Sequence, residues 1–128
     1  MGKRLQSPFV LEYRYKRSTG PVVGRFLQGL LEARVEGVRT RSGRVLVPPR
    51  EYDPENGDPL PEDPWVEVGQ EGTVSSWTEG WALVRLDGAD TSLLHRTLEP
   101  VRTGDRVRIC WAEDRRGHIT DIEGFRAL

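Results

Sequence analysis

The fold class follows from the stretch Thr73-Val-Ser-Ser-Trp-Thr-Glu-Gly-Trp-Ala-Leu-Val-Arg-Leu-Asp-Gly88. β-Branched and aromatic residues are enriched on both sides of Glu79-Gly80, and Asp87-Gly88 closes the run. Such residues pack well on a pleated, half-buried surface, whereas a glycine next to an acidic residue is typical of a tight turn. The stretch therefore predicts a β-hairpin with strands at Thr73–Thr78 and Trp81–Leu86.

Further short strands are predicted on both sides of this hairpin, each bounded by a turn former. They are Trp65–Val68, Ser92–Leu94, Arg106–Ala112 and His118–Glu123. Five or six strands in about 60 residues, with no helix between them, are typical of a small, partly open barrel of the OB type. A small sandwich or an SH3-like barrel is the alternative. Residues 65–128 are expected to form this C-terminal barrel, so the fold class is mainly β.

Two further segments precede the barrel. Residues 34–64 begin with a predicted hairpin that turns at Ser42-Gly43 and continue with a proline-rich, acidic loop. Residues 1–33 begin with Phe9–Arg17, where apolar and basic residues alternate, which predicts an extended arm or a short strand. An amphipathic helix is predicted from Pro21 onward, to pack on the rest of the chain or to dock onto a partner. Its apolar stripe is Val22, Val23, Phe26, Leu27, Leu30 and Leu31.

Composition and charge exclude several classes of protein. Charged residues make up 30% of the 128 residues, and no apolar run approaches the roughly 20 residues of a membrane span. The N-terminus lacks the apolar core of a secretory signal, and the single cysteine excludes an internal disulfide. We therefore expect a soluble, cytoplasmic protein that does not enter a membrane.

The charge is distributed unevenly. Residues 1–50 carry eleven Lys and Arg against three acidic residues, whereas residues 65–128 carry eight against eleven. A barrel that binds nucleic acid would present a positive groove interleaved with exposed aromatic residues, and this barrel is net acidic. We therefore expect no nucleic-acid partner, with a nucleic-acid-binding OB module kept as an alternative.

The sequence shows no catalytic centre. Cys110 has no histidine beside it and is interpreted as structural. Asp87, Asp90 and His95 are imaginable metal ligands, but a hairpin turn followed by a strand already explains Asp87-Gly88; His118 lies near a predicted strand end. No phosphate-binding glycine loop, HExxH or GxSxG motif is present. We expect no catalytic residue, no bound metal and no cofactor.

Residues 39–57 resemble a rubredoxin-like zinc ribbon that lacks its cysteines. Paired ligands would fall at Arg39 and Ser42, then at Asp53 and Asn56. Arginine cannot bind a cation and serine is a poor zinc ligand, so a tetrahedral nitrogen and sulfur site cannot form. The ribbon is therefore expected to be metal-free. Three side chains are expected to pack it instead: Val45, Val47 and Tyr52.

Five pieces of the chain carry a wider resemblance: Phe26–Leu31, Ser42–Arg50, Gly72–Thr78, Ala82–Gly88 and Thr103–Val107. In this order they resemble bacterial and archaeal proteins that join a helical arm, a rubredoxin-like ribbon and an OB fold, and that accompany thiolase-like enzymes. A closer match is carried by Ser7–Tyr13, Ser18–Pro21, Glu51–Pro54 and Leu86–His95. These pieces are similar to the cysteine-free branch found as the C-terminal half of a steroid side-chain enoyl-CoA hydratase subunit.

The resemblance implies a non-catalytic accessory subunit that forms a hetero-oligomer with a thiolase-fold aldolase. That aldolase would cleave a steroid side-chain acyl-CoA by a retro-aldol reaction, as in cholesterol catabolism, with the catalytic residues on the aldolase. An enoyl-CoA hydratase domain is a further implied partner, and acyl-CoA would be met through the complex. A stand-alone acyl-CoA-binding protein is the alternative. The step from Trp77 to Trp81 is shorter than the family's loop, and no hydratase domain is present in the chain.

Four basic residues are candidates for contacting CoA phosphates or an acidic partner surface, because arginine forks bind phosphate and carboxylate groups well. They are Arg14, Lys16, Arg17 and Arg25. A solvated helix face explains them equally well.

Overall fold

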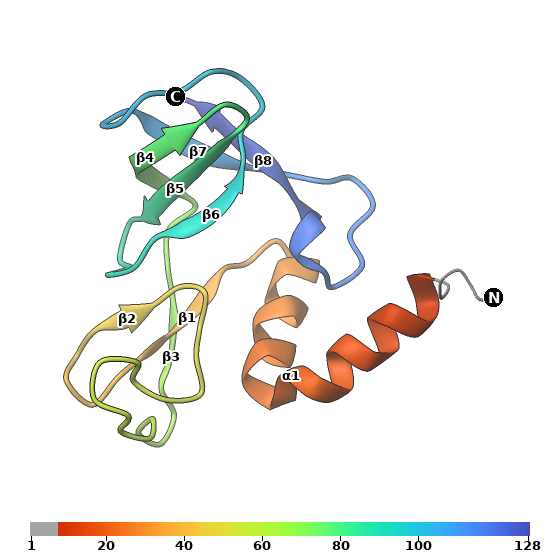
Figure 1. Ribbon diagram of the computed structural model, residues 1–128, viewed down its shortest axis with the longest axis vertical. Helices are drawn as coiled ribbons and strands as arrows, with labels where there is room; N and C mark the ends of the chain where they lie inside the picture. The colour runs from red at the N-terminus through yellow and green to blue at the C-terminus, as the bar shows by residue number, and fades with distance from the viewer. Residues whose placement is uncertain (1–7) are drawn as a thin grey trace.

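The computed structural model describes residues 8–128, with side chains from Gly20 onward, and it is mainly β (Figure 1). One kinked helix lies beside two antiparallel sheets. The elements are α1 (Pro8–Leu31), β1 (Glu36–Arg39), β2 (Val45–Leu46), β3 (Trp65–Glu67), β4 (Glu71–Thr78), β5 (Trp81–Leu86), β6 (Leu93–Arg96), β7 (Arg106–Trp111), the 3₁₀ turn η1 (Ile119–Asp121) and β8 (Ile122–Ala127). Within the described residues, no helix is long and apolar enough to span a membrane.

Helix α1 consists of two segments that meet at Gly20, whose φ of 78° and ψ of 178° are not helical. The second segment begins at Pro21 as predicted, and it buries Phe26, Leu27 and Leu30. The prediction of an extended arm at Phe9–Arg17 is wrong, because the backbone there is helical. Leucine, glutamate, lysine and arginine lose little rotamer freedom in a helix, and this propensity outweighs the short alternation of apolar and basic residues.

The small sheet has the order β2-β1-β3. Strands β1 and β2 form the predicted hairpin, with Arg39 opposite Val45 and a positive φ of 96° at Gly43 in the turn. Strand β3 pairs with β1, so that Gly37 lies opposite Val66. The expectation that Trp65–Val68 belongs to the barrel is therefore wrong. Strand propensity marks the segment as β, but the partner of a strand depends on residues distant in the sequence.

The large sheet has the order β6-β5-β4-β7-β8 and curls into a partly open barrel. Its two edge strands meet where Thr97 forms a parallel bridge with Phe125 and the Leu98 amide donates to the Phe125 carbonyl at 2.8 Å. A Cβ on Gly124 would come within 2.8 Å of Leu98, so this seam needs a glycine. A five-stranded, partly open barrel is the OB arrangement that the sequence predicts.

The last strand starts later than predicted. Residues Ile119–Asp121 form the turn η1, which His118 caps, and β8 begins at Ile122. The Asp121 carboxylate accepts hydrogen bonds from the backbone amides of Arg116, Gly117 and His118. Because a buried aspartate that gathers three amides stabilises a turn, the chain cannot extend into a strand there.

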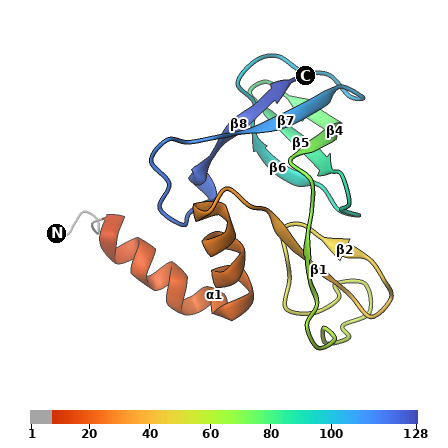
Figure 2. The ribbon, with the colours of Figure 1, turned by 180° about the vertical axis from the view of Figure 1, so that it is seen from behind.

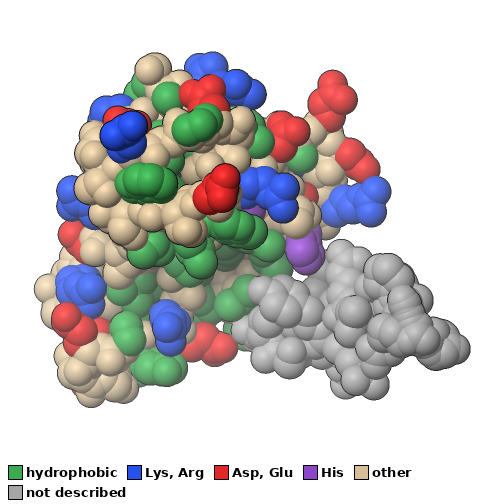
Figure 3. Space-filling model, turned by 45° about the horizontal axis from the view of Figure 1, so that its top comes forward, with side chains coloured by type: hydrophobic (Ala, Val, Ile, Leu, Met, Phe, Trp, Pro, Cys, Tyr) green, Lys and Arg blue, Asp and Glu red, His purple; other side chains and the backbone are tan. Residues whose placement is uncertain are grey.

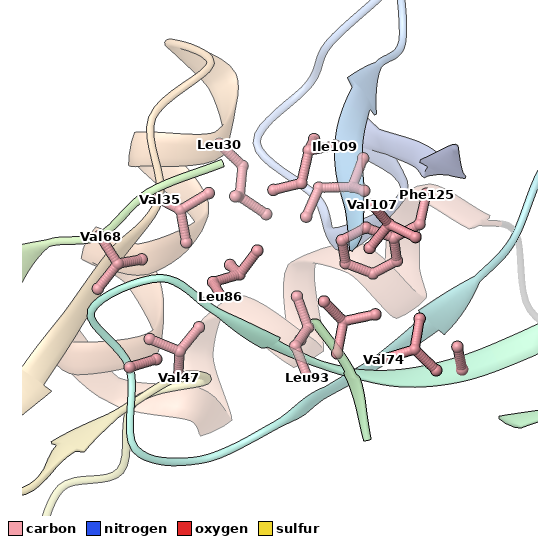
Figure 4. Packing of buried hydrophobic residues seen from close by; sticks show 14 of the residues in the cluster. Leu30, Val35, Val47, Val68, Val74, Leu86, Leu93, Val107, Ile109 and Phe125 are labelled. Carbon is pink, nitrogen blue, oxygen red and sulfur yellow. The ribbon is translucent and has the colours of Figure 1, made fainter. Parts of the chain in front are cut away.

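One apolar core joins the helix, the small sheet and the barrel (Figure 4). Leu30, Val35 and Val47 reach it from the first half of the chain, and Leu86, Val107, Ile109 and Phe125 reach it from the barrel. The loop before η1 also reaches the C-terminal end of α1 (Figures 1 and 2), where Arg115 Nε donates to the Leu31 carbonyl at 3.0 Å. An arginine on the last helical carbonyls satisfies groups that have no partner inside the helix.

Candidate functional site

The ribbon segment is held by hydrogen bonds at the place where a zinc ribbon would carry its metal. Asp53 is 1% exposed, and its carboxylate accepts from the Glu55 amide at 2.9 Å. The Ser42 hydroxyl lies 3.3 Å from the other Asp53 oxygen and 2.9 Å from the Thr40 hydroxyl. Two of the four predicted ligand positions, Ser42 and Asp53, are therefore brought together.

The other two ligand positions do not join them. Arg39 is exposed and donates to the Gly43 carbonyl at 3.4 Å, and the Asn56 side chain accepts from the Asp58 amide at 2.8 Å. Among the residues with described side chains, no group of three His, Cys, Asp or Glu side chains is placed to hold a metal ion. The two turns of the ribbon are thus built from carboxylate and hydroxyl hydrogen bonds.

The packing predicted for the ribbon is correct for two residues and wrong for the third. Val45 and Val47 are buried, but Tyr52 is 47% exposed. The backbone of Tyr52 bridges to Pro59, and this pairing turns its ring outward. Val38 and Leu46 are buried as well.

Asp87 and Asp90, two of the imaginable metal ligands, each have a separate structural partner. Arg106 donates to both oxygens of Asp87, at 2.8 and 2.6 Å, and these bonds hold the pKa of Asp87 below its ordinary value. The Asp90 carboxylate accepts from the Val45 amide at 2.9 Å. These contacts occupy the two carboxylates in different places.

His95, the third imaginable metal ligand, is buried. Its Nε2 lies 2.6 Å from the Ile122 carbonyl, so Nε2 carries the proton and donates it. Burial lowers the pKa of His95, which favours the neutral ring. Cys110, on β7 opposite Gly124, is half-buried on the face that the alternation of β7 predicts. The described geometry assembles no pair of nucleophile and base from these residues.

Of the four basic candidates, Arg25 is the one whose side chain is described. Its Nε and Nη2 each lie 3.1 Å from a Glu36 oxygen, and its guanidinium lies 4.6 Å from the centroid of the Trp65 ring. This fork and the cation–π contact tie α1 to the small sheet. Arg14, Lys16 and Arg17 lie in the first segment of α1, and their side chains are outside the described residues.

One concave surface is an apolar groove of about 650 Å³ between α1, the ribbon and the β5–β6 hairpin. Figure 3 shows apolar side chains gathered across the middle of this face. Arg50 is the charged residue among those described as lining it. The lining includes Val23, Phe26, Leu46, Pro48, Pro49, Leu83, Leu94 and Ile119. A second hollow of about 720 Å³ surrounds the β4–β5 turn and includes Glu79, Glu99 and Asp105.

A surface that the sequence interpretation missed lies next to the groove. Trp81, Leu83 and Leu94 point outward from β5 and β6 and are 42%, 36% and 58% exposed. We call these three residues the β5–β6 apolar patch. The sequence does contain a signal for this surface, because the side chains of a strand alternate strictly between its two faces. The alternation alone does not say which of the two faces meets water.

No protein-family model and no curated protein matches the chain. The solved structures, however, include similar folds. A DUF35-family protein of unknown function from Sulfolobus solfataricus superposes with a TM-score of 0.61 at 21% identity, covering 98% of both chains. A chain of the Ltp2–ChsH2(DUF35) aldolase superposes with a TM-score of 0.58 at 18% identity, covering 86% of this chain and 97% of that one. The chain therefore has the fold of DUF35 proteins.

Proposed function

We propose that this chain is a non-catalytic accessory subunit that binds and supports a thiolase-fold acyl-CoA enzyme. The observation that carries the proposal is the shared fold with a chain of the Ltp2–ChsH2(DUF35) aldolase, which extends over 97% of that chain. Asp87, Asp90 and His95 form hydrogen bonds within the chain that hold the fold together, which is consistent with this role.

The finer proposal follows the sequence resemblance. The partner is an aldolase that cleaves a steroid side-chain acyl-CoA by a retro-aldol reaction, and the acid–base residues belong to that partner. This chain stabilises the aldolase and helps to shape its acyl-CoA site, without a cofactor of its own. An enoyl-CoA hydratase domain is a further member of the complex, and the complex works in the cytoplasm.

Co-expression tests the proposal. The chain is produced together with a thiolase-fold aldolase of the same organism, and the mixture is analysed by sizing chromatography. We expect the two proteins to elute together, and we expect the partner's acyl-CoA cleavage or its solubility to rise when this chain is present. Separate elution at micromolar concentrations of both proteins would refute the accessory role.

The same preparations test the two alternatives. An acyl-CoA-binding protein would bind or turn over a CoA ester with no partner present. A nucleic-acid module would bind single-stranded oligonucleotides with a steep dependence on salt, because binding releases counterions. We expect the isolated chain to do neither.

A further inference from the structure

The β5–β6 apolar patch is an ordered surface on paired strands. Leu83 lies directly opposite Leu94 in the register of β5 and β6, and Trp81 lies opposite Arg96. The Trp81 ring packs edge-on against buried His95, with ring centroids 6.4 Å apart, and His95 packs in the same way against buried Phe125. These two ring contacts connect the patch to the buried core. A rigid surface loses little conformational entropy when a partner binds.

Two arginines border the patch. Arg85 follows Leu83 by two residues on the same face of β5, and the Arg96 guanidinium lies 5.7 Å from the centroid of the Trp81 ring. Neither forms an ion pair within residues 20–128. Elsewhere on the same barrel, Arg106 pairs with Asp87 and Arg126 pairs with Glu99, whereas Arg102 and Arg108 also form no ion pair with the described side chains. Arg96 therefore places a positive charge at the border of the patch that no described carboxylate pairs, whereas Arg85 lies near Asp87.

The patch continues into the apolar groove, because Leu83 and Leu94 belong to both surfaces. Arg50 lies among the groove residues and also forms no ion pair with the described side chains. The combined surface has apolar side chains at its centre and arginines at its border. Protein interfaces commonly have this arrangement, in which apolar anchors carry affinity and bordering charges set the orientation and the association rate.

The charges also select the kind of partner. A two-fold dimer of this chain would place the same arginine-bordered surface against itself, and like charges would then repel. A partner with apolar side chains ringed by aspartate or glutamate would instead complement both the centre and the border. We propose that the β5–β6 apolar patch, with Arg85 and Arg96, is the surface that binds the partner, and that the partner presents an apolar segment bordered by carboxylates. This inference rests on the proposed function.

The experiment measures the affinity of purified variants for the thiolase-fold protein of the proposed function by biolayer interferometry. The double variant Leu83→Thr/Leu94→Thr keeps strand-forming residues while it removes the apolar surface. The double variant Arg85→Glu/Arg96→Glu reverses the border charge. The matched controls are Leu128→Thr and Arg108→Glu, which alter an exposed leucine and an outward arginine away from the patch. Thermal melting and sedimentation of each free variant accompany the binding data.

We expect the leucine double variant to raise Kd by about 30-fold or more, as for residues at the centre of an interface. The arginine double variant should raise Kd mainly at low salt, and both controls should bind like wild type. Wild-type affinity in both double variants would overturn the patch assignment and leave the accessory role intact. Failure of the unaltered chain to bind would overturn the proposed function, and this inference with it. A wild-type homodimer that the leucine variant dissolves would also overturn the assignment, because the occupant would then be a second copy.

Discussion

Asp53 stands at a position where a zinc ribbon would have a ligand, and here its carboxylate organises two turns of the chain. It is buried and accepts hydrogen bonds from the Glu55 amide and the Ser42 hydroxyl. We expect Asp53→Ala to lower the free energy of unfolding by about 1–3 kcal/mol in urea, because buried donors lose their acceptor. Asp53→Asn keeps one acceptor oxygen and should lose less. An alanine variant as stable as wild type would contradict this role.

His95 makes stability depend on pH. Burial lowers its folded-state pKa below the ordinary value of 6.5. As pH falls through about 6.5, the unfolded chain therefore takes up a proton before the folded chain does. The contribution of His95 is fully present above that pH and is lost progressively below it, towards the folded-state pKa.

We therefore expect the wild-type free energy of unfolding to fall between about pH 7 and pH 5 in urea titrations. His95→Gln, which retains a donor for the Ile122 carbonyl, should flatten this dependence. His118→Gln leaves His95 in place and should keep it. Equal slopes for wild type and His95→Gln would show that other groups dominate the pH dependence.

At the scale of elements, the β5–β6 loop is hydrogen-bonded to β2 and to the residue that follows it. The Asp90 amide donates to the Val45 carbonyl at 2.8 Å. The Thr91 hydroxyl accepts from the Val47 amide at 2.8 Å and donates to the Val47 carbonyl at 2.9 Å. The barrel thereby completes the edge of the small sheet, and the ribbon is held in a defined position.

Thr91→Val tests these contacts, because valine preserves the shape of the side chain and removes both hydrogen bonds of the Thr91 hydroxyl. We expect a loss of about 1–3 kcal/mol in the free energy of unfolding. Hydrogen exchange at the Val47 amide should also become faster. Thr91→Ser keeps the hydroxyl and is the matched control. Unchanged exchange in Thr91→Val would mean that the ribbon is held mainly by the apolar core.

The ribbon as an element should also be independent of zinc. We expect elemental analysis of the purified protein to find far less than one zinc per chain, and we expect a chelator to leave Tm unchanged. The reason is that Arg39 cannot bind a cation and Asn56 is engaged with the Asp58 amide. This interpretation would be contradicted by one zinc per chain whose removal by a chelator also lowers Tm.

At the scale of the whole molecule, the basic N-terminal third is proposed to meet an acidic partner surface or the phosphates of CoA. Charge reversal in Arg14→Glu/Arg17→Glu should weaken complex formation or raise KM for acyl-CoA, more strongly at low salt, while Tm moves little. The control is Arg102→Glu/Arg108→Glu on the barrel. If the N-terminal variant assembles and turns over like wild type at low salt, this face is merely solvated.

The sequence by itself determined those features that depend on local chemistry. Strand β5 begins and ends where predicted, and Gly43, Gly80 and Gly88 adopt the positive φ angles that their turns require. The helical stripe from Pro21 buries Phe26, Leu27 and Leu30 as expected. Side-chain shape and backbone freedom act within a few residues, and a single sequence is sufficient to read them.

Only the tertiary structure decided which segments meet and which faces reach water. β3 resembles a barrel strand in sequence, yet it pairs with β1, and Tyr52 is exposed where a buried ring was expected. Leu83 and Leu94 are as apolar as their buried neighbours, and they face outward because the barrel curves towards the opposite set of side chains. Strand pairing and burial are set by contacts between residues far apart in the chain, and no local pattern specifies them.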